Sequence, residues 1–359
     1  MLPPKSPIPS RAAMSNAPSR YLARQKDPAY RQEDPDATAI GSVRRPTRLH
    51  REAARSIISR NQSPDVPFEQ SINPYRGCEH GCIYCFARPS HTRLGMSAGL
   101  DFESEIYWKP DAVRLLDEEL ARRTYRPRII HLGANTDPYQ PVERRLGLTR
   151  ALLERFLHYR HPVTVLTKGA LIERDVDVLA ELARKRLTRV AFSLTTLDDR
   201  MKRTLEPRAA SAHARLRAMR LLADAGVPVS VMVAPVIPKL TDHELENILH
   251  EARQAGATRA GWILLRLPLE VEPLMREWLE AHHPHRAHAV FAMLQGAHHG
   301  QTYDANFHQR QRGSGQYAAL LRQRFDLAIK RLGYETGDPP DLDTKAFRRP
   351  TVGGQLGLL

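Results

Sequence analysis

From about residue 68 onward, short apolar runs alternate with longer segments in which apolar residues recur every three to four positions. The short runs have the length of buried strands, and the longer segments have the period of one helix face. Six such runs occur, near Ser71 and at 128–133, 162–169, 188–196, 227–236 and 260–268. Parallel strands covered by helices produce this alternation. The pattern therefore predicts an α/β fold with six βα-type strands.

The number of strands narrows the architecture. Six is fewer than the eight strands of a closed TIM barrel. We therefore predict a partial (βα)6 TIM-type barrel, with a doubly wound sheet as the alternative, because periodicity cannot separate the two. Beyond the last strand, Leu321, Phe325 and Ile329 lie on one helical face, which predicts a C-terminal helical extension.

The segments on either side of this core differ in composition. The first 65 residues hold 9 of the 27 prolines, no Phe and no Trp, and 12 Lys and Arg against 6 Asp and Glu. Such a segment has too little apolar surface to offset the entropy lost on ordering. We predict a disordered basic arm at 1–65, the core barrel at 66–270, a helical region at 271–340 and a loose tail at 341–359.

Charge is compatible with an anionic partner. The formal net charge is +14, which suits nucleic acid but equally suits a solvated basic surface on a protein of Arg-rich coding. A basic run in the arm could contact phosphates; it consists of Arg44, Arg45, Arg48, Arg51 and Arg55. The first twenty residues contain no apolar signal segment, and the apolar stretch 227–238 is too short to cross a bilayer. The sequence therefore predicts a cytoplasmic protein without membrane contact, and leaves the oligomeric state open.

All three cysteines of the chain fall within the stretch NPYRGCEHGCIYCFARP, as Cys78, Cys82 and Cys85, at the spacing C-x3-C-x2-C. Closely spaced thiols in a reducing compartment indicate a metal site rather than disulfides. Zinc would require a fourth ligand, for which His80 or His91 is a candidate. A [4Fe–4S] cluster held by three thiolates would leave one iron open to a substrate or cofactor.

This spacing, with Tyr84 directly before the third cysteine, resembles the radical S-adenosylmethionine (SAM) superfamily. The resemblance implies that Cys78, Cys82 and Cys85 hold a [4Fe–4S] cluster, that SAM chelates the fourth iron, and that reductive cleavage of SAM yields a 5′-deoxyadenosyl radical. It also implies a partial (βα)6 barrel, in agreement with the strand count. An electron donor such as flavodoxin or ferredoxin is implied as a partner.

The resemblance extends to one branch of the superfamily. The segments GANTDPYQPVE and TKG, after the second and third strands, are similar to the spore photoproduct lyase-like (DNA-repair-photolyase-like) branch. By this resemblance, Thr136 and Asp137 lie near the amino end of SAM, and Lys168 pairs with its carboxylate. Each residue also has an ordinary interpretation: Asp137 before a proline can make a turn, and Lys168 can neutralise a strand end.

Further cofactor contacts follow from the same resemblance. Ser193 and Thr195 are implied at the ribose hydroxyls, Ala234 and Pro235 along the adenine, and Tyr84 at the adenine from the cysteine segment. Glu206 and Arg208 are weaker candidates. The strand-end residues are equally consistent with ordinary strand positions. No catalytic residue beyond the cluster ligands is assigned.

The chain departs from this branch at one position. Spore photoproduct lyases have a hydrogen-donating cysteine where this chain has Asn135, and the chain has no spare cysteine. This difference counts against repair of thymine dimers and leaves the substrate unassigned, with nucleic acid as one candidate. Two other classes stay open: a non-catalytic zinc or iron–sulfur protein associated with nucleic acid, and an iron–sulfur sensor that never cleaves SAM.

Overall fold

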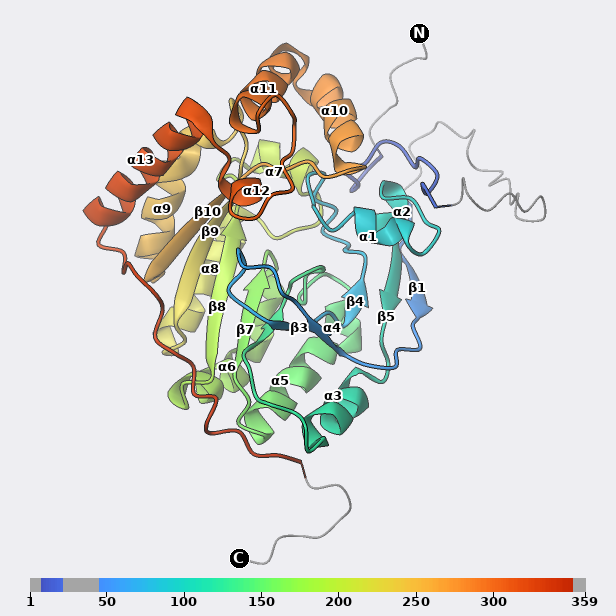
Figure 1. Cartoon of the computed structure of the whole chain (residues 1–359), viewed down its shortest axis with the longest axis vertical. Coiled ribbons are helices and arrows are strands. Elements are labelled where there is room, and N and C mark those ends of the chain that lie inside the picture. Colours follow the sequence, from blue (N-terminus) through green and yellow to red (C-terminus); the bar gives the residue numbers. More distant parts are fainter. Residues whose placement is uncertain (1–7, 22–44, 351–359) are drawn as a thin grey trace, which may run out of the picture.

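The structure is a computed structural model of the chain, and it describes residues 8–21 and 45–350 (Figure 1). Its centre is a seven-stranded sheet in the order β10-β9-β8-β7-β6-β3-β2. Six of these strands pair in parallel, and β2 is antiparallel to β3 at the edge. The strands are β2 (Ile58–Arg60), β3 (Gln70–Ile72), β6 (Ile130–Leu132), β7 (Val163–Thr167), β8 (Thr188–Leu194), β9 (Val229–Val236) and β10 (Arg259–Leu264).

The six parallel strands coincide with the six apolar runs of the sequence. Buried β-branched and aromatic side chains such as Val163, Val190, Phe192 and Val231 form the centre of the sheet. These residue types pack well on a pleated, buried surface, which is why the runs become strands. The predicted α/β fold with a mostly parallel sheet is therefore confirmed.

A layer of helices packs along the sheet, and its members contact each other in chain order (Figure 1). Their apolar stripes face inward: Leu152, Phe156, Leu179, Met219 and Leu249 are all fully buried. These helices are α3 (Ala112–Ala121), α5 (Leu148–His158), α6 (Val176–Arg184), α8 (Ala212–Asp224), α9 (Leu245–Gln254) and α13 (Gly315–Arg331). Their connections therefore bring the carboxyl ends of the six parallel strands to one edge of the sheet.

Shorter elements surround that edge. A three-stranded sheet in the order β1-β5-β4 lies beside it, with β1 (Arg48–Arg51), β4 (Tyr75–Arg76) and β5 (Glu105–Trp108). The remaining α-helices are α1 (Pro89–Thr92), α2 (Leu100–Ser104), α4 (Glu143–Leu146), α7 (Asp199–Leu205), α10 (Val271–His282), α11 (Pro284–Ala297) and α12 (Gln309–Arg312). Two 3-10 helices, Ala170–Asp175 and Asp242–Glu244, precede α6 and α9.

The prediction of a disordered arm at 1–65 is wrong for the parts of it that the structure describes. Residues 48–51 and 58–60 form β1 and β2, and Ala12 and Ala13 are buried. Their backbone N–H groups donate to the carboxylate of Glu103 at 3.1 and 2.9 Å. Long-range pairing thus orders segments whose own composition could not. Residues 1–7 and 22–44 of the predicted arm lie outside the described residues.

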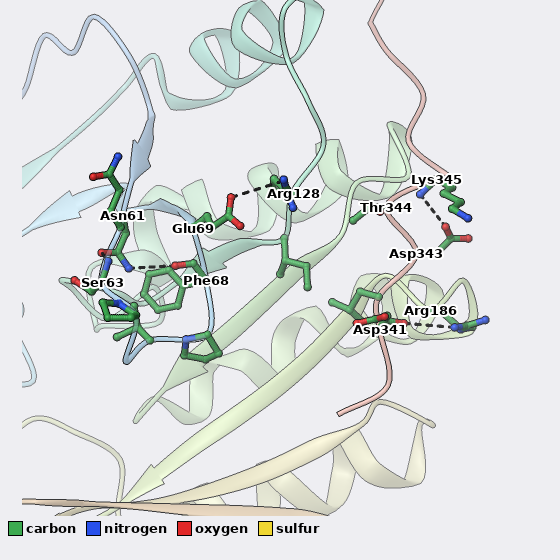
Figure 2. A pocket seen from close by; sticks show the side chains of 16 residues that line it. Asn61, Ser63, Phe68, Glu69, Arg128, Arg186, Asp341, Asp343, Thr344 and Lys345 are labelled. Atoms are coloured by element: carbon green, nitrogen blue, oxygen red, sulfur yellow. Dashed lines mark hydrogen bonds and ion pairs between the residues drawn. The ribbon is translucent and has the colours of Figure 1, made fainter. Parts of the chain in front are cut away.

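The described part of the predicted loose tail is also held in place. The C-terminal strap, residues 341–350, crosses the amino ends of the strands, and Phe347 packs against the rings of Tyr125 and His161. The strap and the segment before β3 border a polar pocket of about 880 Å³ (Figure 2). Two of its charged side chains, Arg128 and Glu69, form an ion pair at 3.7 Å. The remaining residues of the predicted tail, 351–359, lie outside the described residues.

Candidate active site

The cysteine loop, residues 77–88, follows β3 and β4 at the carboxyl edge of the sheet. Gly77 and Gly81 have φ angles of +76° and +67°, a region that favours glycine. A Cβ at Gly77 would lie 2.9 Å from the carbonyl oxygen of Phe102, and one at Gly81 would lie 2.8 Å from Oε2 of Glu103. Both glycines are therefore required by the turn and by close packing.

The three cysteines face a common pocket. Cys78 and Cys82 are buried, Cys85 is half-buried, all three thiols are free, and all three line the same pocket. Burial raises the pKa of the Cys78 thiol well above its usual range and that of Cys82 to about 12. Because a metal ligand must be a thiolate, binding of iron here would displace protons from these sulfurs.

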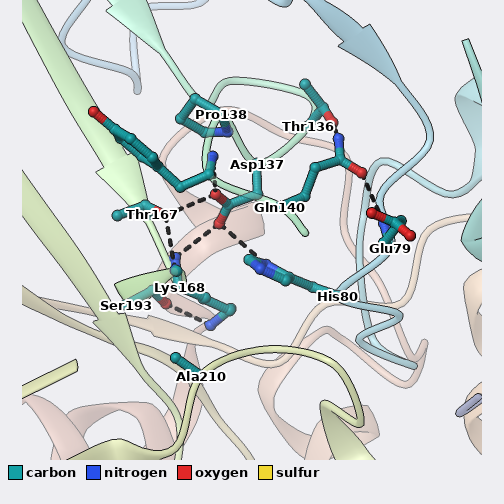
Figure 3. A network of polar contacts seen from close by, with 12 residues as sticks. Glu79, His80, Thr136, Asp137, Pro138, Gln140, Thr167, Lys168, Ser193 and Ala210 are labelled. Atoms are coloured by element: carbon teal, nitrogen blue, oxygen red, sulfur yellow. Dashed lines mark hydrogen bonds and ion pairs between the residues drawn. The ribbon is translucent and has the colours of Figure 1, made fainter. Parts of the chain in front are cut away.

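A second loop, after β6, holds the cysteine loop from the side (Figure 3). Thr136 donates from Oγ1 to the carbonyl oxygen of Gly77 at 2.6 Å, and Oε1 of Gln140 accepts from the backbone N–H of Glu79 at 2.9 Å. Nε2 of Gln140 in turn donates to Thr136 Oγ1 at 3.0 Å. The Thr136 hydroxyl is therefore engaged with the cysteine loop.

Asp137 lies at the centre of this second network. Its carboxylate accepts from Thr167 Oγ1 and from the backbone N–H of Lys168, both at 2.7 Å, and from the backbone N–H of Tyr139 at 2.8 Å. Oδ2 also lies 3.3 Å from Nδ1 of His80 (Figure 3). Burial favours the neutral acid, but the His80 ring and these hydrogen bonds lower the pKa of Asp137 below its usual value.

Lys168 joins three strand ends. Its Nζ donates to Ser193 Oγ at 2.7 Å, to Thr195 Oγ1 at 3.3 Å and to the carbonyl oxygen of Ala234 at 3.1 Å. The same Nζ lies 3.3 Å from Oε1 of Glu206. Because residues 168, 193 and 234 follow or end three adjacent parallel strands, one ammonium group links β7, β8 and β9.

Glu206 carries the negative charge of this cluster. It accepts from the hydroxyl of Tyr84 and from the guanidinium of Arg215, and all three side chains are buried. Burial alone would raise the pKa of Glu206, but Arg215 and Lys168 lower it far below its usual range. This buried cluster contains two cations, Lys168 and Arg215, and one carboxylate, Glu206. Its net charge is therefore positive, and Lys168 is the cation that lines the pocket.

Most of the predicted SAM contacts meet in the pocket of the three cysteines. The pocket is lined by Tyr84, Thr136, Asp137, Lys168, Ser193, Ala234 and Pro235. Thr195 lies behind this lining, where its Oγ1 contacts the Tyr84 hydroxyl at 3.0 Å and donates to Ala234 O at 2.8 Å. Of the weaker candidates, Glu206 belongs to the Lys168 cluster, whereas Arg208 pairs with Glu79 at 2.8 Å.

The two histidines considered for zinc each have one ring nitrogen next to an oxygen of the protein. Nδ1 of His80 faces Asp137, and Nε2 of His91 lies 3.0 Å from the carbonyl oxygen of Glu105. His80 lines the pocket of the cysteines, whereas His91 does not. Across residues 8–21 and 45–350, no three His, Cys, Asp or Glu side chains surround a single point as one metal ion would require. Thiolates that bind different irons of a cluster need not converge on one point, so the three cysteines fit a cluster better than a zinc ion.

Sequence reasoning missed the pair of side chains beneath the cysteine loop. Arg88 donates to the carbonyl oxygens of Gly81 and Cys82 at 3.1 and 3.0 Å, and to Oε1 of Glu103 at 2.5 Å. Both Arg88 and Glu103 are fully buried. Arg88 stands within the quoted cysteine stretch, but nothing in the sequence pattern pointed to Glu103 as its partner.

The family of the chain is shown by sequence comparison. The Radical SAM superfamily model matches residues 72–252. This range includes all three cysteines and the carboxyl ends of five of the six parallel strands. The chain therefore belongs to the radical SAM superfamily. This membership confirms the predicted family, whose cofactors are a [4Fe–4S] cluster and SAM.

Several relatives share part of the chain. An uncharacterized protein of Mycobacterium tuberculosis (strain H37Rv) is 37% identical over 221 residues, which cover 61% of this chain and 65% of that protein. An uncharacterized protein of Methanocaldococcus jannaschii is 27% identical over 182 residues, covering 51% of this chain and 65% of that one. The chain thus matches slightly less than two thirds of the length of these relatives.

Among solved structures, the fold is similar to spore photoproduct lyase. The complex of that enzyme with dinucleoside spore photoproduct superposes with a TM-score of 0.51 at 17% identity, over 80% of each chain. A variant of the same enzyme with bound AdoMet and dinucleoside spore photoproduct gives the same TM-score. At this identity the similarity concerns the fold.

In the described ranges, none of the helices has both the length and the apolar character that crossing a bilayer requires.

Proposed function

We propose that the chain cleaves SAM reductively at a [4Fe–4S] cluster held by Cys78, Cys82 and Cys85. The observation that carries this proposal is the meeting of these three thiols with Lys168 in one pocket at the carboxyl edge of a parallel sheet. Such edges are where α/β folds place their active sites. We interpret the sheet and its helices as the partial (βα)6 barrel of the superfamily.

When bound, the cluster would supply the electron that cleaves SAM to methionine and a 5′-deoxyadenosyl radical. The role of the chain is to hold both cofactors and to exclude water. Arg88 and Gln140 fix the backbone of the cysteine loop through the contacts described above. An external electron donor such as flavodoxin or ferredoxin would be required, because each reductive cleavage of SAM consumes one electron.

Electrostatics support the proposed place of the SAM carboxylate. Lys168 and Arg215 face the single carboxylate of Glu206, so an anion arriving beside Lys168 would balance the remaining positive charge. Ser193 then offers a hydroxyl group for the ribose, and Ala234 and Pro235 offer an apolar wall for the adenine. Thr195 would act from behind the pocket lining, through its contacts with Tyr84 and Ala234. Thr136 and Asp137 would lie towards the amino group of SAM, where a carboxylate is suited to an ammonium.

The test of this proposal is anaerobic reconstitution with iron and sulfide, followed by dithionite and SAM. We expect 5′-deoxyadenosine and methionine to form in amounts that depend on the cluster. Protein that carries a full cluster and binds SAM but forms no 5′-deoxyadenosine with dithionite would contradict reductive cleavage and favour an iron–sulfur sensor.

Replacing Lys168 by Ala should weaken SAM binding while the cluster remains. A charge-assisted contact to the SAM carboxylate contributes about 1.5–3 kcal/mol, so the Kd should rise about ten- to a hundredfold. The measurement is a titration of SAM against the EPR signal of the reduced cluster. Lys202→Ala is the matched control, since Lys202 also lies near Glu206 but donates to the carbonyl oxygen of Pro207. An unchanged Kd in Lys168→Ala would leave Lys168 with a purely structural role.

The reaction that follows SAM cleavage is left unassigned. Asn135 lines the pocket at the position where spore photoproduct lyases carry the hydrogen-donating cysteine, and a carboxamide offers no comparably weak bond to hydrogen. We therefore do not extend to this chain the substrate that is bound in the spore photoproduct lyase structures.

Nucleic-acid binding through the arm at 1–65 stays a prediction. The positive charge of this segment is not spread evenly along it. Residues 22–44 contain four basic and four acidic side chains, so the excess of positive charge lies in the segments 8–21 and 45–65 and in Lys5. There Arg45 pairs with Asp101 at 2.7 Å, and Arg51 stacks on Trp108. Arg48 stays largely exposed. A negative slope of log affinity against log salt would reveal phosphate contacts, and its absence at low salt would remove this candidate.

A further inference from the structure

Arg266 occupies the rim of the same pocket, beyond the end of β10. It lines the pocket together with Phe86 and the apolar residues Ile263 and Leu265. Its guanidinium carbon lies 4.1 Å from the centroid of the Phe86 ring, and Phe86 directly follows the third cysteine. Phe86 is 45% exposed. A cation and an aromatic face are thus presented together beside the cysteine loop.

Arg266 differs from the other cations of the site in having no anionic partner. Arg88 is paired with Glu103, Arg215 with Glu206, and Lys168 also with Glu206. Within the part of the chain that the structure describes, the Arg266 guanidinium makes no hydrogen bond or ion pair, and its contact is the stacking on Phe86. None of its five N–H donors is therefore committed to an acceptor among the described residues.

The surroundings of Arg266 do not neutralise it. The groups that act on it are Tyr303, Arg310, Asp65 and Cys85. The carboxylate of Asp65 is already paired with Arg310, whose guanidinium donates to it at 2.5 and 2.6 Å. Burial lowers the pKa of Arg266, because it partly removes the charge from water, and the opposing effects of Tyr303, Asp65 and Cys85 do not offset it. An unpaired, partly desolvated guanidinium of this kind is suited to bidentate binding of an oxyanion.

SAM does not account for this second cation. Its amino-acid part has one carboxylate, which the proposed function assigns to Lys168, and the sulfonium and adenine carry no negative charge. The cluster on its three thiolates would carry a net negative charge near Arg266, as the effect of Cys85 on this guanidinium indicates. That charge is spread over sulfurs, however, and offers no pair of oxygens that matches the guanidinium fork. A bidentate oxyanion partner for Arg266 is therefore to be sought in the substrate.

We propose that Arg266, backed by Phe86, binds an oxyanion of the substrate at the mouth of the pocket. The substrate class is therefore a molecule with a phosphate or carboxylate group a short distance from the carbon that loses hydrogen. Phe86 keeps the guanidinium plane open to the pocket and offers its exposed ring to an apolar or flat part of the substrate. This inference rests on the proposed function for the identity of the cofactor pocket.

The experiment measures the rate at which phenylglyoxal modifies individual arginines, resolved by peptide mass spectrometry. Reconstituted full-length protein with an oxidised cluster and saturating SAM is treated in chloride, in acetate and in inorganic phosphate at equal ionic strength. We expect saturating phosphate or acetate to slow modification of Arg266 about tenfold or more, as a charged hydrogen-bonded contact should. Protection by phosphate alone indicates a phosphoryl group, and protection by acetate alone a carboxylate.

Arg312 is the internal control. It too stacks on an aromatic ring, that of Trp262 at 4.5 Å, and has no ion pair among the described residues, but it lines a different pocket. Its rate should be the same in all three salts. Equal rates at Arg266 in all three salts, or protection of Arg266 and Arg312 alike, would overturn the proposal.

A second measurement separates substrate from cofactor. Arg266→Gln and Arg312→Gln should both bind SAM with the wild-type Kd, as followed by the EPR signal of the cluster. A tenfold rise confined to Arg266→Gln, or protection of Arg266 by SAM alone, would assign the guanidinium to SAM and contradict the proposal. Because the footprint uses an oxidised cluster, it gives its answer even if no 5′-deoxyadenosine forms, so failure of the proposed function is seen separately.

Discussion

Alanine at Cys78, Cys82 or Cys85 should each abolish the [4Fe–4S] cluster, and with it the formation of 5′-deoxyadenosine. The reason is the donor set: the chain has no other thiol, and the three present ones line one pocket. With one thiolate removed, two irons of the cluster would lack a protein ligand, and no fourth cysteine exists in the chain to replace it. Iron and sulfide content after anaerobic reconstitution measures the effect.

The control for this experiment is a substitution of similar size close by. Ser90→Ala changes one side-chain atom in α1, two residues after the cysteine loop, and Ser90 does not line the pocket. It should reconstitute like the wild type. If the triple alanine variant still held iron near the wild-type stoichiometry, the cysteines could not be the cluster ligands.

Glu103→Gln should destabilise both the fold and the cysteine loop. Glu103 and Arg88 form a fully buried ion pair, and the same carboxylate accepts from the backbone N–H groups of Ala12 and Ala13. Removing one charge of a buried pair leaves the other uncompensated, which costs about 3–5 kcal/mol. We expect the free energy of unfolding to fall by that amount, and the cluster to be lost faster to an iron chelator, as followed by its visible absorbance.

Two further variants keep this prediction testable if Glu103→Gln does not fold. Deleting residues 1–21 removes the two N–H donors but leaves the Arg88–Glu103 pair, so the protein should fold and still lose its cluster faster than the wild type. Glu118→Gln breaks an exposed pair with Arg114 and should change stability by less than about 1 kcal/mol. Wild-type cluster retention in the deletion variant would show that residues 8–21 do not support the cysteine loop.

The sequence was sufficient for the elements whose causes are local. The β-branched run that ends in Thr167 and the helix face of Leu152 and Phe156 each contain the period of their own structure. The cysteine loop was predictable for the same reason, because its ligands and its turn glycines, Gly77 and Gly81, are close together in the chain.

Other features could not be predicted because their causes lie far apart in the sequence. β1 has only four residues, and it exists because it pairs in parallel with β5, more than fifty positions away. Arg88 and Glu103 are polar residues at positions with no helical or strand period, and only the fold shows that they are buried together. The position of Arg266 at the pocket could not be predicted either, because nothing in the sequence distinguishes it from the other arginines.

The arrangement of the sheet also limits which piece of this protein could be produced for study. The matched region, residues 72–252, ends before β10 and begins after β2, the two strands at the edges of the seven-stranded sheet. Cutting there would leave β9 and β6 with unpaired backbone groups along edges that are normally covered, and would remove Trp262 from the core. Exposed apolar edges of this kind favour pairing between molecules. Expressed alone, the matched region would therefore tend to aggregate. A piece that keeps both edge strands and the support of the cysteine loop has to include Ala12, Ala13 and the sheet from β2 through β10.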